Sequence, residues 1–585
     1  MAWSLVQAHV PHGDYNFCLG KGCAARMLGR ESEEQRHEPL PMAKLSLKVK
    51  SLVKVFNTTA VCIPEKHYMV DLSERVKEIK KLVDAGKYFT INRARQYGKT
   101  TTIDALYKVL IAENVVISLD FQDIEDGSFK NGGEFSKAFA RIILDAEEFD
   151  GLAIPKVIIE RVKELAEKPS SDVKMDDLFR VFRMWFKEEK RPVVLIVDEV
   201  DTATNNQVFL DFLAQLRSLY LKREKNHEIK TFQSVILAGV TDVKHLRSKI
   251  RPDDEHKINS PWNIAADFDI DMSLSEAGIK GMLDEYEADH HTGMNTGLIA
   301  SYIREHTNGY PYLVSRICEI IDTKLVPARF DNLTAAWTEY GVETAIKMLL
   351  EETGNALFDS LTGKLLIYPE LKKKLRDILL KGETLAWLPY DEEQQQLFMF
   401  GFIRNNHNTV AISNRIFERL LYTHFIGESD KNNDLKQKAS EIKSIFVDDE
   451  GWLDVPKIME HFIKEHNRIH GDNDEKFLEE EGRERFVTYV SAIINGTGTY
   501  DIEPQTRDHK RMDLVIHYLG QQYIIELKIW RGERYNAEGE KQISEYLDYF
   551  GLTTGYMLSF NFNKNKETGV KRIELGDKVL FEGTV

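Results

Sequence analysis

Residues 88–101 read Tyr88-Phe-Thr-Ile-Asn-Arg-Ala-Arg-Gln-Tyr-Gly-Lys-Thr-Thr101 and decide the fold of the larger part of the chain. An apolar strand-like run leads into a Gly-Lys-Thr triplet, and helix-favouring residues follow. Gly98 lets the backbone approach a phosphate, Lys99 reaches the β/γ oxygens, and Thr100 can ligate Mg²⁺. The amides at the start of the next helix point at the same anion. The stretch therefore predicts a phosphate-binding loop for ATP. Its candidate nucleotide-binding residues are Arg95, Gln96, Tyr97, Gly98, Lys99, Thr100 and Thr101.

An acidic strand end further along the chain supports this site. The apolar run Val193–Val197 ends in Asp198 and Glu199. In such a pair the aspartate holds the Mg²⁺ shell and the glutamate polarises the attacking water. The alternative is a core strand with a solvated acidic turn, but the combination with the phosphate loop favours an ATP site. Another strand, Ser234–Ala238, leads to Thr241, which is a candidate γ-phosphate sensor or a cap of the next helix.

Length and composition bound the class of protein. The 585 residues are too many for one core and indicate three or four domains. The 42% hydrophobic and 29% charged residues are typical of a globular chain. The net charge of −16 argues against a protein that coats nucleic acid with its whole surface. Few cysteines without a zinc pattern, and no apolar run of membrane-spanning length, predict a cytoplasmic protein with no membrane partner.

Short β-branched runs alternate with helical segments from about 50 to 270. Fully apolar strands of this kind are typical of a parallel sheet covered on both faces, so we expect an α/β fold. Residues 275–330 and most of 330–400 read as helices. The segment 398–413 reads as a hairpin with an Asn-rich turn, and helices before such a hairpin are typical of a winged helix.

Six motifs are spread along this region: His67–Asp71, Arg93–Thr100, Val197–Glu199, Ala238–Asp242, Ser260–Ala265 and Gly309–Leu313. On these motifs the chain, over roughly residues 50–425, resembles the AAA-like ATPases of bacteria that are related to the STAND class. The resemblance implies that Gly309 and Pro311, in the Gly-Tyr-Pro turn of a helical lid, touch the nucleotide. A helix-breaking turn is the alternative for the same residues.

Two features of this region allow more than one interpretation: the first residue of the phosphate loop and two arginines after the β-strand-like run 234–238. Arg93 stands five residues before Gly98, where phosphate loops usually carry glycine, although in this family that glycine is often replaced. Arg247 and Arg251 are candidate arginine fingers or ordinary surface arginines. A finger supplied by a neighbouring copy would require a homo-oligomer.

A second constellation lies near the C-terminus. Arg511-Met-Asp513-Leu-Val-Ile is followed by a turn at Gly520 and by Tyr523-Ile-Ile-Glu526-Leu-Lys528. If the two runs pair as a hairpin, the pleat can bring both carboxylates and the ammonium to one edge, since residues two apart share a face. Such a group suits a divalent metal and a water to be activated. By itself, Glu-x-Lys is also explained by a solvated edge strand.

From about 440 to 585 the chain resembles the PD-(D/E)XK phosphodiesterase fold, a restriction-endonuclease-like α/β fold. The resemblance implies that Asp513 and Glu526 hold Mg²⁺, with Mn²⁺ as an alternative. It implies that Lys528 orients or deprotonates the attacking water and stabilises the phosphorane-like charge. A preceding acidic helix offers a further acid, Glu484, with Glu481 as its rival.

Downstream of these residues, Gln542 and Tyr546 show a spacing seen in many nuclease members, and positions i and i+4 share one helical face. The proline that the fold's name implies is replaced by Met512. Arg531 and Arg534 follow the metal strand and either touch a phosphate backbone or lie in a solvated loop.

The sequence therefore predicts an ATP-binding and ATP-hydrolysing protein that controls a tethered metal-dependent nuclease, with nucleic acid, DNA in the first place, as partner. Defence against foreign DNA is a natural setting by analogy. The alternative is an ATP-driven switch whose nuclease-like fold only binds a partner. The expected segments are an extension with poor order at 1–41, an ATPase core at 42–272, a helical lid at 273–334, a winged-helix-like region at 335–427, a linker at 428–440 and a nuclease-like domain at 441–585.

Overall fold

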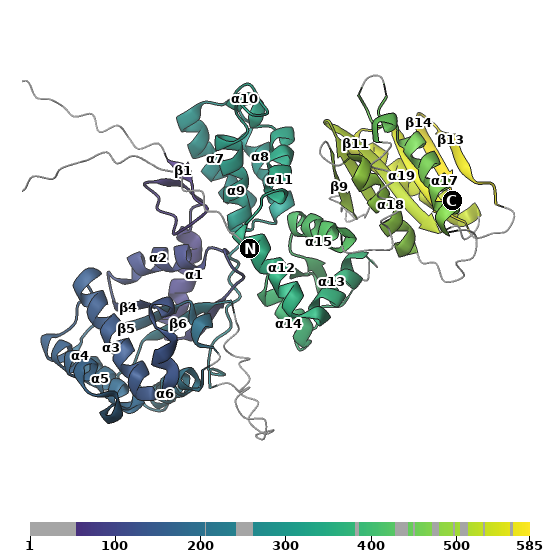
Figure 1. The fold of residues 1–585 in the computed structure, drawn as a ribbon. Helices are drawn as coiled ribbons and strands as arrows, with labels where there is room; N and C mark the ends of the chain where they lie inside the picture. Colours follow the sequence, from purple (N-terminus) through teal and green to yellow (C-terminus); the bar gives the residue numbers. More distant parts are fainter. Residues whose placement is uncertain are drawn as a thin grey trace, which may run out of the picture. The chain divides into compact units, whose positions relative to one another are not determined.

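A four-stranded parallel sheet carries the phosphate loop (Figure 1). Its strands run in the order β3-β6-β5-β4. Every residue of β5 and β6 is buried, as the unbroken apolar runs predicted. Ala266 forms one further parallel bridge with Phe89 on the outer side of β3. The strands of this sheet are β3 Tyr88–Asn92, β4 Val115–Asp120, β5 Val193–Asp198 and β6 Ser234–Gly239.

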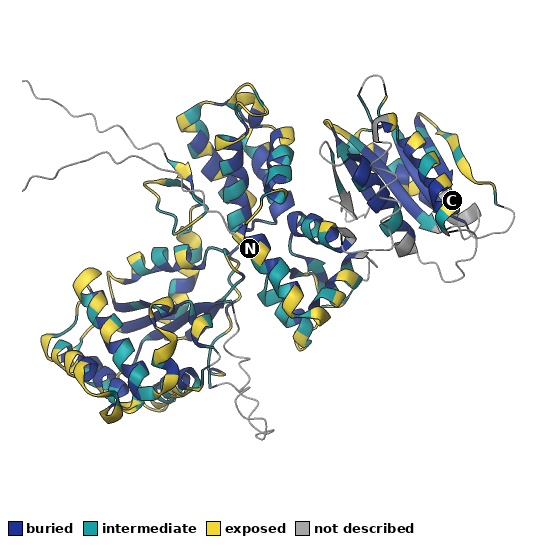
Figure 2. Cartoon of the chain, viewed as in Figure 1, coloured by how far each residue is buried: buried dark blue, intermediate teal, exposed yellow. Residues whose placement is uncertain are grey.

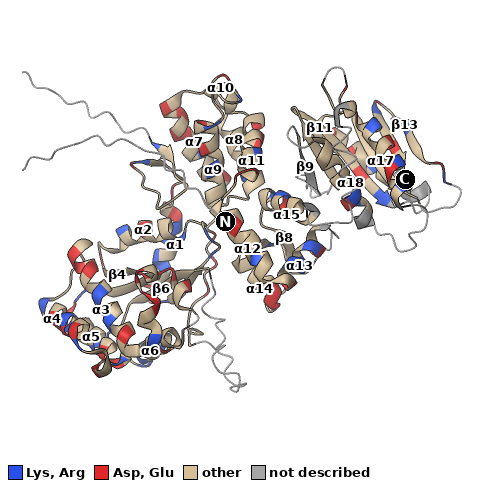
Figure 3. Ribbon diagram, in the orientation of Figure 1, with Lys and Arg blue, Asp and Glu red and all other residues tan. Residues whose placement is uncertain are grey.

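Helices cover both faces of this sheet (Figure 2), and successive residues of a strand point to opposite faces and so enter different cores. Tyr88 belongs to a core rich in phenylalanine that is shared with α3 to α6, whereas Phe89 belongs to the core shared with α1 and α2. Acidic and basic residues are interspersed along these helices (Figure 3). The helices are α1 Ser73–Asp84, α2 Lys99–Leu110, α3 Gly132–Phe149, α4 Lys156–Glu167, α5 Met175–Glu188 and α6 Gln207–Lys225.

A helical region follows, and the predicted hairpin lies within it. The hairpin turns at His407 and Asn408, which both have positive φ, as a tight two-residue turn requires. A short parallel pair, β1 Val55–Phe56 and β2 His67–Tyr68, packs on α9 and α7. The elements are α7 Glu276–His290, α8 Thr296–Thr307, α9 Pro311–Thr323, α10 Leu333–Ala336, α11 Glu339–Leu350, α12 Ala356–Ile367, α13 Pro369–Leu380, α14 Glu392–Met399, β7 Ile403–Asn406, β8 Thr409–Ile412 and α15 Arg415–Gly427.

The C-terminal domain is built on a mixed six-stranded sheet in the order β13-β14-β12-β11-β10-β9. The β10–β11 pair is the predicted antiparallel hairpin, and α19 makes the crossover from β11 to the parallel β12. Three strands, β12, β13 and β14, follow α19. The elements are α17 Val455–His470, α18 Glu479–Ile494, β9 Gly498–Ile502, β10 Leu514–Tyr518, β11 Gln521–Ile529, α19 Glu533–Phe550, β12 Thr554–Phe560, β13 Gly569–Leu575 and β14 Lys578–Thr584.

The structure is a computed structural model, and it describes residues 54–204, 206–240, 261–380, 385–427, 443–448, 451–470, 479–494, 498–502, 513–529, 533–561 and 566–585. The predicted extension and linker lie outside these ranges. Within them, no helix is long and apolar enough to cross a membrane.

Candidate active sites

The phosphate loop joins β3 to α2, and Gly98 ends it. Gly98 has φ +75° and precedes the first residue of α2, so its left-handed backbone turns the chain into the helix. Lys99 is 6% exposed, and its Nζ donates to the carbonyls of Arg93 at 3.1 Å and Ala94 at 3.2 Å. Burial lowers the pKa of Lys99, and the charge of Glu199 is the main influence against this shift. The ammonium therefore lies inside the loop that an ATP phosphate would enter.

Thr100 and Asp198 come together at the carboxyl end of the sheet. The Thr100 hydroxyl donates to Asp198 Oδ2 at 2.9 Å. Burial raises the pKa of Asp198, while hydrogen bonds from the Glu199 amide and from Thr100 act against the rise. A hydroxyl and a carboxylate side by side are hard oxygen ligands, which fit a Mg²⁺ ion that also binds ATP phosphates.

Glu199 follows Asp198 with φ +51°, a left-handed conformation that non-glycine residues rarely adopt. Residues with strained backbone of this kind are concentrated at functional sites, where the strained conformation helps to hold a side chain in position. Burial is the main cause that raises the pKa of Glu199, and the charge of Lys99 opposes the rise. Asp201, which sequence reasoning left without a role, accepts a hydrogen bond from the Val240 amide at 2.6 Å. It thus ties this turn to the end of β6.

Arg93 occupies the place of the usual glycine and turns away from the loop. Its guanidinium donates to the carbonyls of Asn92 and Ile270, both at 2.9 Å, and lies over the Phe268 ring. These contacts join β3 to the segment beside it. The replacement of glycine by arginine thus leaves the interior of the loop to Lys99.

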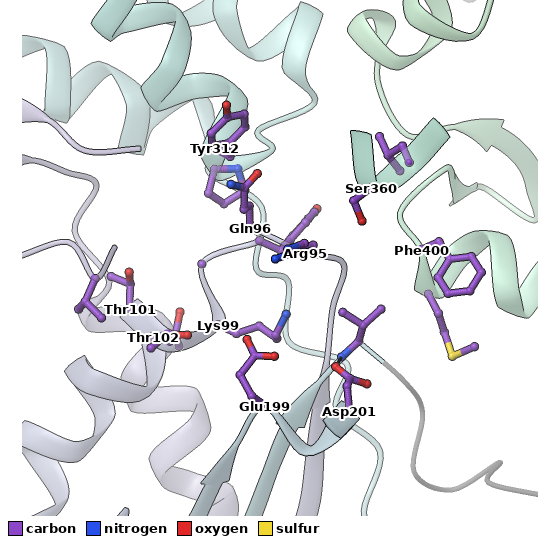
Figure 4. Close-up of a pocket in the computed structure, with 18 of the residues that line it drawn as sticks. Arg95, Gln96, Lys99, Thr101, Thr102, Glu199, Asp201, Tyr312, Ser360 and Phe400 are labelled. Carbon is purple, nitrogen blue, oxygen red and sulfur yellow. Dashed lines mark hydrogen bonds between the residues drawn. The ribbon is translucent and has the colours of Figure 1, made fainter. Parts of the chain in front are cut away.

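A cavity of about 1600 Å³ opens over the loop (Figure 4). All seven predicted loop residues, 95–101, line it together with Glu199 and Pro311. Figure 4 shows Lys99, Glu199 and Asp201 around one space, with Ser360 and Phe400 on its far side. Sequence reasoning missed several lining segments because they come from distant parts of the chain. They are 57–62, Asp120, Gln122, Met282, Ser360, Lys364, Tyr368, Tyr390, Gln395, Gln396 and Phe400.

The residues of the predicted Gly-Tyr-Pro turn have different places: one lines the cavity, and the other two pack in the protein interior. Pro311 lines the cavity, and its ring lies beside Gly98. Gly309 has φ +69°, and a Cβ there would lie 2.2 Å from the Leu274 carbonyl oxygen, so close packing requires glycine. Tyr310 is buried between them, and its hydroxyl donates to the Arg95 carbonyl. Thr241, Arg247 and Arg251 lie outside the described residues.

The nuclease-like residues meet at the β10–β11 hairpin. Leu514 pairs with Ile525, which sets Asp513 opposite Glu526 at the end of β10. Asp513 Oδ2 accepts a hydrogen bond from the Leu527 amide at 2.7 Å. Lys528 Nζ lies 2.8 Å from Glu526 Oε1. The two carboxylates and the lysine thus share one edge of the sheet, as the spacing predicted.

Glu526 is 1% exposed, and among the described residues its Oε2 has no hydrogen-bond partner. Burial and the charge of Asp513 raise its pKa to about 7, although Lys528 favours the ionised form. A buried oxygen of this kind fits a metal ligand, because a cation would supply its missing partner. No cluster of three or more His, Cys, Asp or Glu within the described ranges could hold a metal. A cation at Asp513 and Glu526 would therefore need backbone carbonyls, water or a phosphate as further ligands.

The acidic helix α18 brings an arginine, not a carboxylate, to Asp513. Arg483 Nη2 lies 3.3 Å from Asp513 Oδ1 and is the site residue that sequence reasoning missed. Glu484, the predicted further acid, instead has its Oε1 3.6 Å from Arg376 of α13. The side chain of Glu481 is outside the described part. Glu484 thus stays a prediction as a metal ligand, with a different contact in this structure.

Helix α19 covers the site from the other side. Tyr546 is buried, and burial together with the charges of Glu526 and Asp513 raises its pKa. Gln542, one turn earlier, is exposed. A Cβ on Gly539 would lie 3.8 Å from the Lys528 stem, so the helix packs closely over this lysine. The side chains of Arg531 and Arg534 are not described.

The chain is similar to two protein families. A family model described as an AAA-like domain matches residues 62–423, and one for the PD-(D/E)XK nuclease superfamily matches residues 500–573. No curated protein matches the chain.

Solved structures are similar at low identity. A Walker-type ATPase of Pyrococcus abyssi is 12% identical, with a TM-score of 0.43, over 63% of this chain and 99% of that one. The ORC1 protein of Aeropyrum pernix in complex with DNA is 10% identical, with a TM-score of 0.29, over 61% and 93%. The RuvB Holliday junction branch migration motor of Thermotoga maritima is 13% identical, with a TM-score of 0.29, over 61% and 95%.

Proposed function

The chain belongs to the AAA-like domain family and carries a PD-(D/E)XK nuclease-superfamily domain after it, and from this premise we propose that it is a nuclease controlled by ATP. The observation that carries the proposal is that each site brings its motif residues together. Lys99, Thr100 and Glu199 line one cavity, and Thr100 donates a hydrogen bond to Asp198. Asp513, Glu526 and Lys528 meet at the other site. A cytoplasmic setting and a role against foreign DNA belong to the same proposal.

At the ATP site, each residue has a distinct task. Lys99 exchanges its contacts with the loop carbonyls for phosphate oxygens, and the amides of α2 bind the same phosphates. Mg²⁺ held by Thr100 and Asp198 would neutralise phosphate charge. Glu199 lies at the cavity edge and accepts a proton from the attacking water. Its raised pKa brings this carboxylate closer to the basicity that a general base needs near neutral pH.

At the nuclease site, the residues act on a phosphodiester. A divalent cation at Asp513 and Glu526 would polarise the phosphate and lower the pKa of water. Lys528 is held beside Glu526 and orients the attacking water, and its charge stabilises the developing phosphorane. Tyr546 is buried close enough to both carboxylates for their charges to raise its pKa.

Packing contacts give ATP a route to the nuclease domain. A Cβ on Gly401 would lie 2.6 Å from the Ala94 Cβ, so the hairpin region touches the phosphate loop. The Tyr310 ring packs on Tyr97 at 4.7 Å and on Phe417 of α15 at 5.3 Å. The other end of α15 contacts β9, the neighbour of β10. A nucleotide that moves the loop therefore acts on elements that reach the nuclease sheet.

Tyr500 belongs to the contact between α15 and β9. It lies on β9, and burial raises its pKa to about 12, with the Thr423 hydroxyl and the Arg419 charge of α15 acting against the rise. Hydrolysis of a phosphodiester is downhill and needs no ATP, so in this proposal the ATPase supplies control rather than driving force.

Cleavage of plasmid and single-stranded DNA tests the proposal, with Mg²⁺ or Mn²⁺ and with or without ATP. Lys528→Ala should lower cleavage by about 10²-fold or more, whereas Lys541→Ala, an exposed lysine on α19, should leave it unchanged. Lys99→Ala should remove the effect of ATP, and Lys108→Ala, exposed on the same helix α2, should keep it.

The outcomes separate the two functions. Cleavage that needs Lys528 and responds to ATP only with Lys99 supports the proposal. ATP hydrolysis without cleavage under any of these conditions would refute the nuclease and favour the ATP-driven switch.

A further inference from the structure

We propose that Arg483 binds the nucleic-acid phosphate at the nuclease site, and that Asp513 holds it until a divalent cation takes the same oxygen. This inference rests on the proposed nuclease function and adds a residue that the motif does not contain. Arg483 lies on α18, is 9% exposed and approaches Asp513 Oδ1 at 3.3 Å. A guanidinium matches phosphate oxygens in geometry and remains charged at any relevant pH.

The position of Arg483 is built by close packing of α18 on the sheet. A Cβ on the preceding residue, Gly482, would lie 2.5 Å from the Phe560 ring of β12. Glycine at this place therefore lets the helix approach the sheet and brings the arginine into the site. Phe486, one turn further, is fully buried and helps to fix the helix. The side chain is thus placed by the fold rather than by chance contact at a surface.

Asp513 uses its two oxygens for two different partners. Oδ2 accepts the Leu527 amide at 2.7 Å, which fixes the carboxylate to β11. Oδ1 faces Arg483. A cation bound by Asp513 would meet the guanidinium at this oxygen, and two positive groups on one oxygen repel each other. The guanidinium then turns to a phosphate oxygen, which is the nearest new anion that substrate brings.

The charges of the site agree with this exchange. Arg483 pairs with Asp513 and Lys528 pairs with Glu526, so the four groups sum to zero once Glu526 is ionised, as it is when a cation has displaced its proton. A divalent cation raises the sum to +2. This charge suits a phosphodiester that gains a second negative charge when the water attacks. Without Arg483 the site would have one positive group fewer to meet that charge.

The test uses the full-length chain and two binding measurements that need no cleavage. The first is calorimetric titration of Mn²⁺ without nucleic acid or nucleotide. Arg483→Gln should bind Mn²⁺ about three- to tenfold more tightly than wild type, because a competing positive charge is removed. The second is binding of a short duplex oligonucleotide in Ca²⁺, which should be about ten- to a hundredfold weaker in Arg483→Gln.

Arg485 is the matched control. It lies two residues further along α18, and its Nη1 is 3.1 Å from His466 Nε2. Arg485→Gln should change neither measurement. Arg483→Lys keeps the charge but loses the fork, so it should keep wild-type Mn²⁺ affinity and recover only part of the oligonucleotide affinity.

Opposite changes in the two affinities are the expected signature. Weaker binding of both Mn²⁺ and oligonucleotide in Arg483→Gln would mean that the arginine only supports Asp513, and would overturn the inference. Unchanged affinities would overturn it too. Failure of the wild-type chain to bind Mn²⁺ through Asp513 and Glu526 would instead refute the proposed nuclease function.

Discussion

Divalent-cation binding at the nuclease site should depend on pH through Glu526. Burial and the nearby charge of Asp513 raise the pKa of this carboxyl from 4.5 to about 7. A cation must displace the proton, so its affinity rises about tenfold per pH unit below the pKa and levels off above it. Between about pH 6 and about pH 8 the affinity should therefore increase by about tenfold, or about 1.4 kcal/mol.

The magnitude follows from the surroundings of the carboxylate. A change from 4.5 to about 7 corresponds to about 3 kcal/mol of unfavourable ionisation for a side chain that is 1% exposed. Because the folded-state pKa lies above the unfolded value, the folded chain keeps a proton that the unfolded chain loses. The cost to stability is thus absent below about pH 4.5 and complete above about pH 7. A bound cation offsets it.

Calorimetric titration of Mn²⁺ at about pH 6, 7 and 8 measures this effect. Titration in two buffers of different ionisation enthalpy also gives the number of protons released, which should fall from nearly one to nearly zero across this range. Glu526→Gln isolates the contribution of the site. Lys528→Met should move the rise in affinity to higher pH, because Lys528 lowers the pKa of Glu526. Binding that needs Glu526 yet shows neither pH dependence nor proton release would refute the reasoning.

Three further predictions concern the ATPase domain. Glu199→Gln should keep ATP binding while steady-state hydrolysis falls by about 10²- to 10³-fold; equal loss of both would contradict its role as a base. Gly401→Ala places a Cβ 2.6 Å from the Ala94 Cβ and should weaken binding of a fluorescent ATP analogue by about tenfold. The control is Gly354→Ala, at φ +73° in open space. It carries only left-handed backbone strain of about 1 kcal/mol and should leave binding of the analogue unchanged. Arg93→Ala removes contacts with the Asn92 and Ile270 carbonyls and should lower the free energy of unfolding by about 1–3 kcal/mol in urea denaturation, with ATP affinity within about twofold.

Local spacing made much of the fold predictable, together with the grouping of motif residues at the two candidate sites. The run from Tyr88 to Thr101 carries strand, loop and helix in one stretch, so the phosphate loop follows from sequence order alone. The pair Asp513 and Glu526 is also local, because a hairpin turn at Gly520 fixes which residues face each other. Both interpretations depend on contacts between neighbours in the chain.

What sequence reasoning missed depends on packing between distant segments. Whether Arg483 or Glu484 faces Asp513 is decided by the rotation of α18, and the close contact of Gly482 with Phe560 sets that rotation. Helical periodicity alone fits several rotations. The distant lining of the ATP cavity, such as Lys364, is likewise brought in by the packing of the helical region on the loop.

Both sites share a feature that bears on control. Lys99 is bonded to carbonyls of its own loop, Lys528 to Glu526, and Arg483 to Asp513. Each cation that would act on a phosphate is thus held by an acceptor of the same site, and a ligand must replace that acceptor. Replacement is a local rearrangement of a packed site, and the loop that holds Lys99 also touches Gly401. An exchange of partners at Lys99 therefore changes the contacts of the helical region, whereas an exchange at Asp513 needs only cation and phosphate. Under the proposed control by ATP, loss of ATP binding should change when the chain cuts nucleic acid and leave intact the cleavage chemistry, which depends on Asp513, Glu526 and Lys528.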